Sequence, residues 1–295
     1  MNNTFFNICT DVDYSSESIK KMKLDFPEDD FVDARFDQPF NNKLKKLIVV
    51  FSTERSGSTF LCDLMYRAGV CLPHEYFQPY NYMPLFAERW GALDGGKISI
   101  KSYCQSLIKN RTSADGVLGL NLHGSHIYLF EQARKYFGNP KVEYYFLKRS
   151  NIISQAISYE IAFQTQAWSS EYRKSKIELV YNFEMIMEKL LWLEFDLLKI
   201  DVYCKKNALC PNVIYFNELV KDTSGYMLKQ FNVEFNEVEQ GLKKQSTAIN
   251  KFWLQRFSNE FDLSQELPPK HIAQSQLSLP DRFIRKLSKV IRSIY

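Results

Sequence analysis

The chain has 295 residues, of which 45% are hydrophobic and 15% aromatic, so it can fill the core of one sizeable α/β domain or of two small ones and is not disordered as a whole. Its 38 basic and 34 acidic residues leave a net charge of +4, which is too weak for a general nucleic-acid binder. None of the six cysteines forms a C-x-x-C pair, which argues against a structural zinc site and favours reduced thiols in a cytoplasmic protein.

The amino-terminal part differs in pattern from the rest of the chain. Residues 1–44 are polar and irregular, and we expect them to form a short extension that caps the domain. The first residues lack a basic region followed by a long apolar core, and no stretch of about 20 apolar residues occurs. We therefore expect neither a signal peptide nor a membrane span, and a cytoplasmic location.

Four short apolar segments are predicted to be strands. The first, KLIVVFS at Lys46–Ser52, is apolar, β-branched and too short for a helix, which is typical of a buried parallel strand. The other three predicted strands are 116–123, 142–148 and 213–216.

Segments with helical periodicity alternate with these strands. One helix is predicted from Ser58 to about Gly69, and another from Ser150 or Asn151, which are both good N-cap residues. Two further helices are predicted near 127–137 and over roughly 174–207.

The alternation of strands and helices predicts an α/β fold. We expect a P-loop-like, mostly parallel sheet that carries helices on both faces. This domain is predicted to span 45–262, between the extension at 1–44 and a carboxy-terminal tail at 263–295.

The segment TERSGST, Thr53–Thr59, joins the first strand to the first helix. Free N–H groups of the first helical turn and the helix dipole favour an anion at such a junction, and Arg55 adds a full positive charge. The P-loop pattern has a lysine before its hydroxyl residue, whereas this loop reads Gly57-Ser58-Thr59. The loop therefore predicts a site for an anion that needs no metal, with an ordinary Ser-capped turn as the alternative.

Three stretches in order along the chain carry a family resemblance. ERSGSTFLCDLMYRAGV with the following PHEYF looks like the bacterial Stf0 type of sulfotransferase. LKRSNIISQAISYEIAFQTQAW, Leu147–Trp168, is similar to the strand and helix that bind the 3′-phosphate in that family. KQSTAINKFWLQRF, Lys244–Phe257, resembles its C-terminal region. The resemblance implies a donor, 3′-phosphoadenosine 5′-phosphosulfate (PAPS), no metal, and a carbohydrate acceptor.

The resemblance also implies which residues hold PAPS. It gives the 5′-phosphosulfate to the loop Arg55–Thr59 and the 3′-phosphate to Arg149 and Ser158. Reasoning from the residues agrees, because Arg149 ends a strand and Ser158 lies two turns into the next helix, so both can face one anion. A surface ion pair and a plain helix position are the alternatives for these two residues. The residues expected to bind the donor are Arg55, Ser56, Gly57, Ser58, Thr59, Arg149, Ser158, Lys244, Trp253 and Arg256.

Glu75, in LPHEYF, is the expected base. The resemblance assigns the proposed base to this position, and burial can raise the pKa of a carboxylate so that it accepts a proton near neutral pH. His74 is the rival, because a neutral imidazole is a natural base. Arg55 is expected to stabilise the departing phosphate.

Aromatic residues and histidines near the motifs are candidates for the acceptor site. Tyr76, Phe77 and Trp168 suit a sugar or an adenine ring, although a place in the core is the alternative for each. His123 and His126 are spaced i, i+3 across a strand–helix junction. A zinc pair is conceivable there, but no cysteine or carboxylate joins them in the sequence, so we expect structural histidines that line the acceptor pocket, and no metal.

Three positions depart from the family pattern. Glu54 stands where members often have proline, Ser150 where they often have a second arginine, and Asn121 where they often have lysine. These departures support one alternative, a non-catalytic anion-binding module. A P-loop kinase or nucleotidase is another, and it would need Mg²⁺ and the missing lysine.

The end of the chain, DRFIRKLSKVIRSIY at 281–295, is predicted to be a basic amphipathic helix. It either docks on the domain or lies on an anionic membrane surface. The second arrangement would favour a glycolipid acceptor at the inner face of the membrane. A homodimer stays open, and no nucleic-acid partner is expected.

Overall fold

The structure, a computed structural model, describes residues 5–6, 14–24, 31–38, 43–168, 177–234 and 248–266. The chain forms two compact units, Met1–Asn250 and Lys251–Tyr295. The predicted tail helix at 281–295 and Lys244 lie outside the described residues. Within the described part, no helix has the length and apolar character needed to cross a membrane.

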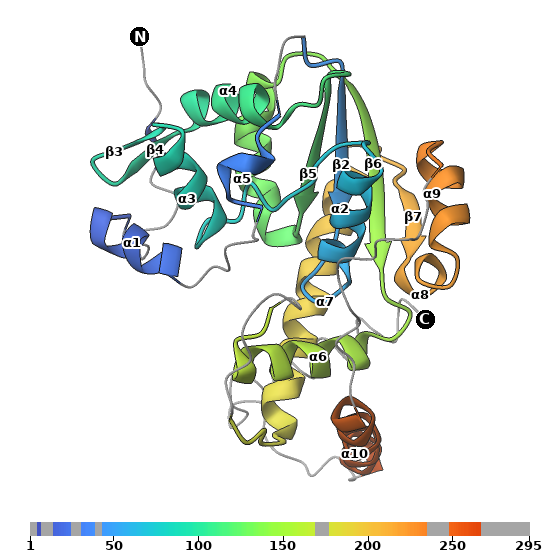
Figure 1. Cartoon of the computed structure of the whole chain (residues 1–295). Helices are drawn as coiled ribbons and strands as arrows, with labels where there is room; N and C mark the ends of the chain where they lie inside the picture. Colours follow the sequence, from blue (N-terminus) through green and yellow to red (C-terminus); the bar gives the residue numbers. More distant parts are fainter. Residues whose placement is uncertain are drawn as a thin grey trace. The chain divides into compact units, whose positions relative to one another are not determined.

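A four-stranded parallel sheet in the order β5-β2-β6-β7 forms the centre of the first unit (Figure 1). Leu47–Phe51 of β2 is at most 2% exposed, because this strand has neighbours on both sides and side chains packed on both faces. The four predicted strands and the mostly parallel sheet are confirmed. The strands are β2 (Lys46–Phe51), β5 (Val117–Leu122), β6 (Lys141–Lys148) and β7 (Asn212–Tyr215).

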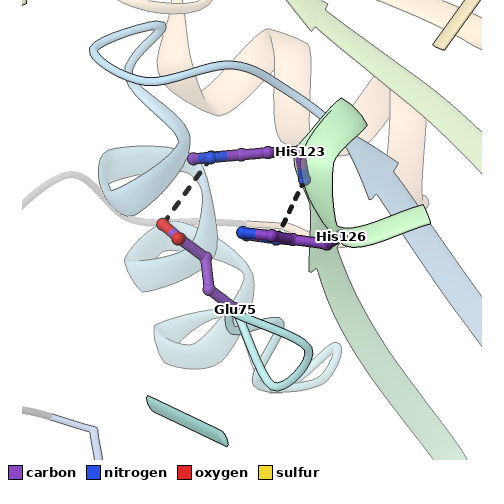
Figure 2. Close-up of side chains that lie close together, drawn as sticks. All are labelled: Glu75, His123 and His126. Carbon is purple, nitrogen blue, oxygen red and sulfur yellow. Dashed lines mark hydrogen bonds and ion pairs between the residues drawn. The ribbon is translucent and has the colours of Figure 1, made fainter. Parts of the chain in front are cut away.

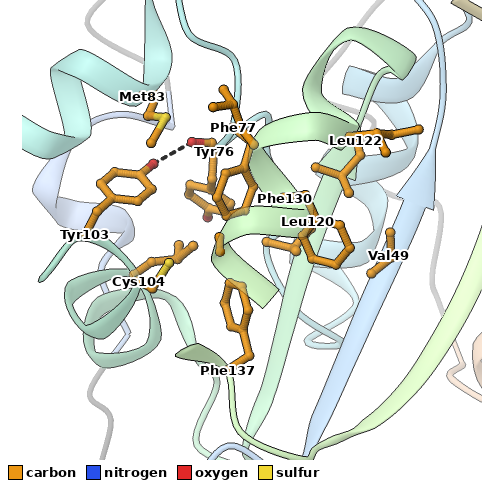
Figure 3. Close-up of a cluster of buried hydrophobic side chains, with 14 of the residues drawn as sticks. Val49, Tyr76, Phe77, Met83, Tyr103, Cys104, Leu120, Leu122, Phe130 and Phe137 are labelled. Atoms are coloured by element: carbon orange, nitrogen blue, oxygen red, sulfur yellow. Dashed lines mark hydrogen bonds between the residues drawn. The ribbon is translucent and has the colours of Figure 1, made fainter. Parts of the chain in front are cut away.

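Alternate residues of β2 belong to two hydrophobic clusters on opposite faces of the sheet. Val49 and Phe51 lie in the larger cluster, with side chains from α3, α4, α5 and α7. Figure 3 shows Val49 in this cluster with Met83, Tyr103 and Phe130. Ile48 and Val50 lie in the smaller cluster, with α2, α8 and α9. Helices therefore cover both faces, as predicted. Their bounds are α2 (Ser58–Arg67), α3 (Tyr82–Arg89), α4 (Ile100–Arg111), α5 (Ile127–Ala133), α6 (Ile152–Thr165), α7 (Phe183–Lys206), α8 (Phe216–Leu219), α9 (Thr223–Phe231) and, reaching into the second unit, α10 (Ala248–Glu266).

Side-chain caps fix where two of the predicted helices begin. Helix α6 starts after Asn151, whose side chain accepts the backbone N–H of Ser154 at 2.8 Å. Helix α7 begins at Phe183 and not near residue 174 as predicted, because the Asn182 side chain accepts the backbone N–H of Met185 at 3.1 Å. Residues 174–176 lie outside the described part of the chain.

Several elements were not predicted. Between residues 77 and 115 the chain forms α3, α4 and the short strands β3 (Leu93–Asp94) and β4 (Lys97–Ser99). Strand β4 pairs with β3 and with β1 (Phe5–Phe6) in a small antiparallel sheet. The amino-terminal extension contains α1 (Ser16–Leu24) and a 3-10 turn at Ala34–Phe36. Strands of two or three residues are too short for an alternating pattern to be read from the sequence.

The guanidinium of Arg111 ties the extension to the domain. Arg111 is 0% exposed, and it donates to the carbonyls of Phe31 (2.7 Å), Asp33 (3.2 Å) and Phe36 (3.3 Å). Its Nε also lies 3.2 Å from the carboxylate of Asp37. A buried charge is tolerated only when it is paired and hydrogen-bonded, so residues 31–38 belong to the same core as α4.

Gly119 sets how closely the segment before Glu75 approaches β5. A Cβ at this position would lie 2.7 Å from the Cys71 sulfur and 2.8 Å from the Pro73 backbone nitrogen. We therefore expect Gly119→Ala to lower the free energy of unfolding by about 1–3 kcal/mol through overpacking, as measured by urea denaturation. An unchanged unfolding midpoint would contradict this close contact.

Candidate active site

The anion loop, Thr53–Thr59, leaves the carboxyl end of β2 and enters α2. Gly57, the residue before α2, has φ of +99°, in the left-handed region that glycine tolerates. A Cβ on Gly57 would lie 2.2 Å from the Phe216 ring, so the loop has no room for a side chain there. The hydroxyl of Ser56 is buried and has no hydrogen-bond partner among the described residues. The first turn of α2 thus offers donors to a ligand above the strand.

Helix α6 is fastened to this loop by side chains far apart in sequence. Gln155 donates to the Thr53 hydroxyl at 2.7 Å and to the Glu54 carbonyl at 2.6 Å. Arg55 donates through Nε to the Ser158 hydroxyl at 3.3 Å, and through Nη1 to the carbonyl of Trp168. The structure therefore brings together Arg55 and Ser158, two residues predicted to hold the donor.

Arg149 adds a second cation beside the loop. Its guanidinium lies 5.0 Å from the centre of the Phe216 ring, and its buried Nε has no hydrogen-bond partner within the described part of the chain. Burial, together with the charge of Arg149, lowers the pKa of Arg55 to about 10, and burial lowers the pKa of Arg149. Two half-buried guanidinium groups whose charged forms are disfavoured in this way form a place where an anion is stabilised.

Glu75 and His123 lie close together, beside His126 (Figure 2). His123, which follows β5, is a buried side chain with a carboxylate at each nitrogen. Its Nε2 lies 3.7 Å from Glu75 Oε1, and its Nδ1 lies 3.7 Å from Glu54 Oε1. Glu54, the first departure from the family pattern, thus turns its carboxylate to His123.

Burial and charge act in opposite directions on these three groups. Burial lowers the pKa of His123, but Glu75 and Glu54 raise it to about 9. Burial raises the pKa of Glu54, but the His123 charge and hydrogen bonds lower it to about 2. Burial raises the pKa of Glu75, while the charge of His123 works against that rise. The two neighbouring glutamates therefore favour the charged form of the His123 imidazole, against the effect of burial.

The ligand atoms of Glu75, His123 and His126 lie within 4.8 Å of one another, close enough for a metal ion. A carboxylate partner for the two histidines was not expected from the sequence, and the fold supplies Glu75. However, His126 Nδ1 accepts the backbone N–H of His123 at 3.2 Å, so its ring proton sits on Nε2, where a metal would have to bind. The Nδ1 and Nε2 atoms of His123 each lie 3.7 Å from a carboxylate oxygen. The hydrogen bond at His126 Nδ1 therefore disfavours a metal ion held by all three residues.

Helix α7 supplies two residues that were not predicted from the sequence. Trp192 donates its indole N–H to Glu54 Oε1 at 3.1 Å. Asp196 is 0% exposed and accepts the backbone N–H of Gly124 at 2.7 Å, one residue after His123. Buried aspartates are unusual, but the burial of Asp196 is seen only in the folded structure. The sequence itself offers only an acidic residue within a long helical segment.

His74 lies in an aromatic environment. Its ring is within 6.0 Å of those of Phe31, Tyr76, Tyr82 and Phe86, and burial together with the Arg111 charge lowers its pKa to about 3. Its carbonyl accepts the backbone N–H of Asn121 in β5 at 2.9 Å, which holds the neighbouring Glu75 at the end of the sheet.

The other predicted site residues lie in different places. Tyr76 and Phe77 are 0% exposed and pack in the larger hydrophobic cluster. Asn121, the third departure from the family pattern, accepts the Ser52 hydroxyl at 2.6 Å in the sheet. Trp253 and Arg256 lie on α10, where Arg256 pairs with Glu260 at 2.9 Å.

Comparison with known proteins identifies the family of this chain. The family model described as Stf0 sulphotransferase matches residues 47–260, which is most of the chain and includes the anion loop, Glu75, Arg149 and Ser158. No curated protein matches the chain. The resemblance read from the sequence is thereby confirmed, and the chain belongs to the Stf0 sulphotransferase family.

Proposed function

We propose that this protein transfers a sulfuryl group from PAPS to a hydroxyl of a carbohydrate or glycolipid acceptor, with Glu75 as the base and without a metal. Family membership supports sulfuryl transfer. The observation that carries the choice of donor is the meeting of Arg55, Ser158 and Arg149 around the loop. PAPS carries an anionic group at the 3′ and at the 5′ position of its ribose, and these residues offer two cations and several hydrogen-bond donors.

The buried polar atoms fit this donor. Arg149 Nε and Ser56 Oγ have no partner among the described residues, and a phosphate oxygen would give each an acceptor. Arg55 and the amides at the start of α2 are suited to the 5′-phosphosulfate, and Arg149 with Ser158 to the 3′-phosphate. Ser150, the second departure, leaves Arg149 as the arginine of that motif.

The reaction follows from these positions. Glu75 takes the proton of the acceptor hydroxyl as its oxygen forms a bond to sulfur. The bond between sulfur and the bridging oxygen breaks on the opposite side, and Arg55 with the loop amides stabilises the charge that develops on the leaving phosphate. The products are a sulfate ester, 3′-phosphoadenosine 5′-phosphate (PAP) and one proton.

Glu75 suits the role of base better than His74. The Glu75 side chain is 22% exposed and stands at the end of the sheet beside the loop, whereas His74 is enclosed by aromatic rings. An acceptor hydroxyl can therefore reach Glu75 without displacing core side chains. For the acceptor itself, the half-exposed ring of Trp192 near Glu54 is a suitable neighbour for a sugar. The cytoplasmic location, the membrane contact of 281–295 and a homodimer stay predictions.

Calorimetric titration tests the donor. PAP in EDTA is expected to bind the full chain, and Arg149→Ala is expected to weaken that binding about 10- to 100-fold, because hydrogen bonds to a charged group contribute about 1.5–3 kcal/mol. A parallel titration with ATP and Mg²⁺ is the control. Binding of ATP with Mg²⁺ and not of PAP would contradict the proposal and favour a kinase.

A further inference from the structure

The proposed reaction leaves one part of the site without a role. It needs Glu75 and the cations of the anion loop, but it does not need His123, Glu54 or Asp196. His123 nevertheless lies between Glu54 and Glu75, and Asp196 binds the backbone N–H of the next residue, Gly124. His123 is only 5% exposed, and both of its nitrogens face carboxylates.

The surroundings of His123 come from four segments of the chain. Glu54 belongs to the loop after β2, and Glu75 to the segment before α3. His126, one turn further along the chain, stacks on His123 with ring centres 4.8 Å apart and an angle of 13° between the planes. Helix α7 adds the carboxylate of Asp196, which in turn lies 3.4 Å from the ammonium of Lys199. The carboxylates outnumber the cations around the ring, which favours a charged imidazole.

We propose that His123, held as an imidazolium between Glu54 and Glu75, is a positioning residue that keeps the base aimed and ionised. This inference rests on the proposed role of Glu75. Glu54 fixes the orientation of the ring by attracting Nδ1, so that Nε2 faces Glu75. The charge on the ring then opposes the effects of burial and of the neighbouring carboxylates, which would otherwise keep a proton on Glu75.

The arrangement also decides where the acceptor proton goes. An imidazolium carries protons on both nitrogens and cannot accept another. The proton from the acceptor hydroxyl therefore moves to a carboxylate oxygen of Glu75 and leaves for solvent after the sulfate ester forms. His123 keeps its own two protons throughout, so it does not act as a relay.

NMR of the histidine side chains measures the protonation of His123 directly, because the chain has only four histidines: His74, His123, His126 and His271. In the full chain labelled with ¹³C-histidine, the ring signal of His123, assigned with His123→Gln, is expected to titrate with a midpoint near pH 9. Glu75→Gln and Glu54→Gln are each expected to lower that midpoint by about one to three pH units. Glu88→Gln, which removes a surface carboxylate paired with Lys23, is the control and is expected to leave it unchanged.

A second readout separates positioning from a merely structural role. In protein labelled at the glutamate carboxyl carbon, His123→Gln is expected to raise the midpoint of Glu75 titration. Coupling between two sites is reciprocal, so this rise should equal the fall in the His123 midpoint caused by Glu75→Gln. A His123 midpoint at or below 6.5, or unequal responses of the two residues, would overturn the inference.

The remaining outcomes are distinguishable. Zn²⁺ added to the labelled protein is expected to leave the histidine signals unchanged. Joint shifts of the His123 and His126 signals would instead indicate a metal site and overturn the proposed ion pairs. The titrations need neither donor nor acceptor. PAP binding with a low His123 midpoint would overturn this inference alone. Absence of PAP binding with a high midpoint would support the ion-pair geometry and contradict the proposed function alone.

Discussion

Glu75→Gln is expected to reduce sulfuryl transfer by about 10²- to 10⁴-fold while PAP binding stays at the wild-type level. The amide keeps the size of the side chain and its place at the end of the sheet, but it cannot take a proton from the acceptor. The proposed donor site, which is built from the anion loop, α6 and the end of β6, does not include Glu75.

The measurement is release of PAP from PAPS in the presence of a mixed pool of disaccharides and alkyl glucosides, with calorimetry of PAP binding beside it. Glu88→Gln serves as the matched control, since Glu88 pairs with Lys23 at 2.8 Å on the surface. Transfer by Glu75→Gln at the wild-type rate would move the role of base to another residue. Loss of PAP binding in this variant would instead indicate a misfolded site.

The second large effect is expected from Arg55→Ala. It should weaken PAP binding by about 10- to 100-fold, because a charge-assisted hydrogen bond to phosphate contributes about 1.5–3 kcal/mol and each 1.4 kcal/mol is tenfold in affinity. Arg55→Lys keeps the charge and loses the planar fork that bonds to Ser158, so an intermediate affinity is expected.

Calorimetric titration of PAP in EDTA provides the comparison for both variants. Arg134→Ala is the control, because the Arg134 side chain is 45% exposed and pairs with Glu131 at 3.4 Å. Its affinity for PAP should match that of the wild type. If Arg55→Ala binds PAP as tightly as this control, the loop does not hold the 5′-phosphosulfate.

The sheet and the anion loop could be predicted because their signals are local. Lys46–Ser52 is a continuous apolar run, and the residues after it change at once to Arg, Gly and hydroxyl side chains. It could also be predicted that Arg55 and Arg149 lie at one edge of the sheet, since parallel strands bring their carboxyl ends together, whereas the contact between Arg55 and Ser158 is known only from the structure. The family resemblance added the name of the donor, which pattern alone does not provide.

The surroundings of the base could not be predicted. Glu54 could be noted only as a departure from the family pattern, and its partners Trp192 and His123 lie 138 and 69 residues away in the sequence. Which side of α7 faces the site depends on how that helix packs against α6, and no local pattern specifies it. The protonation of His123 depends in turn on carboxylates that only the folded chain assembles.

Arg111 has a consequence for where the autonomous folding unit begins. The family match starts at residue 47, but the fully buried guanidinium donates to the carbonyls of Phe31, Asp33 and Phe36, and its Nε lies 3.2 Å from the carboxylate of Asp37. A truncation at the family boundary would remove these partners together with residues that cover Arg111, so the side chain would be exposed to water and α4 would lose its contacts with residues 31–38. The part of the chain that the family model matches is therefore shorter than the part that packs together as one folded core, which includes residues 31–38.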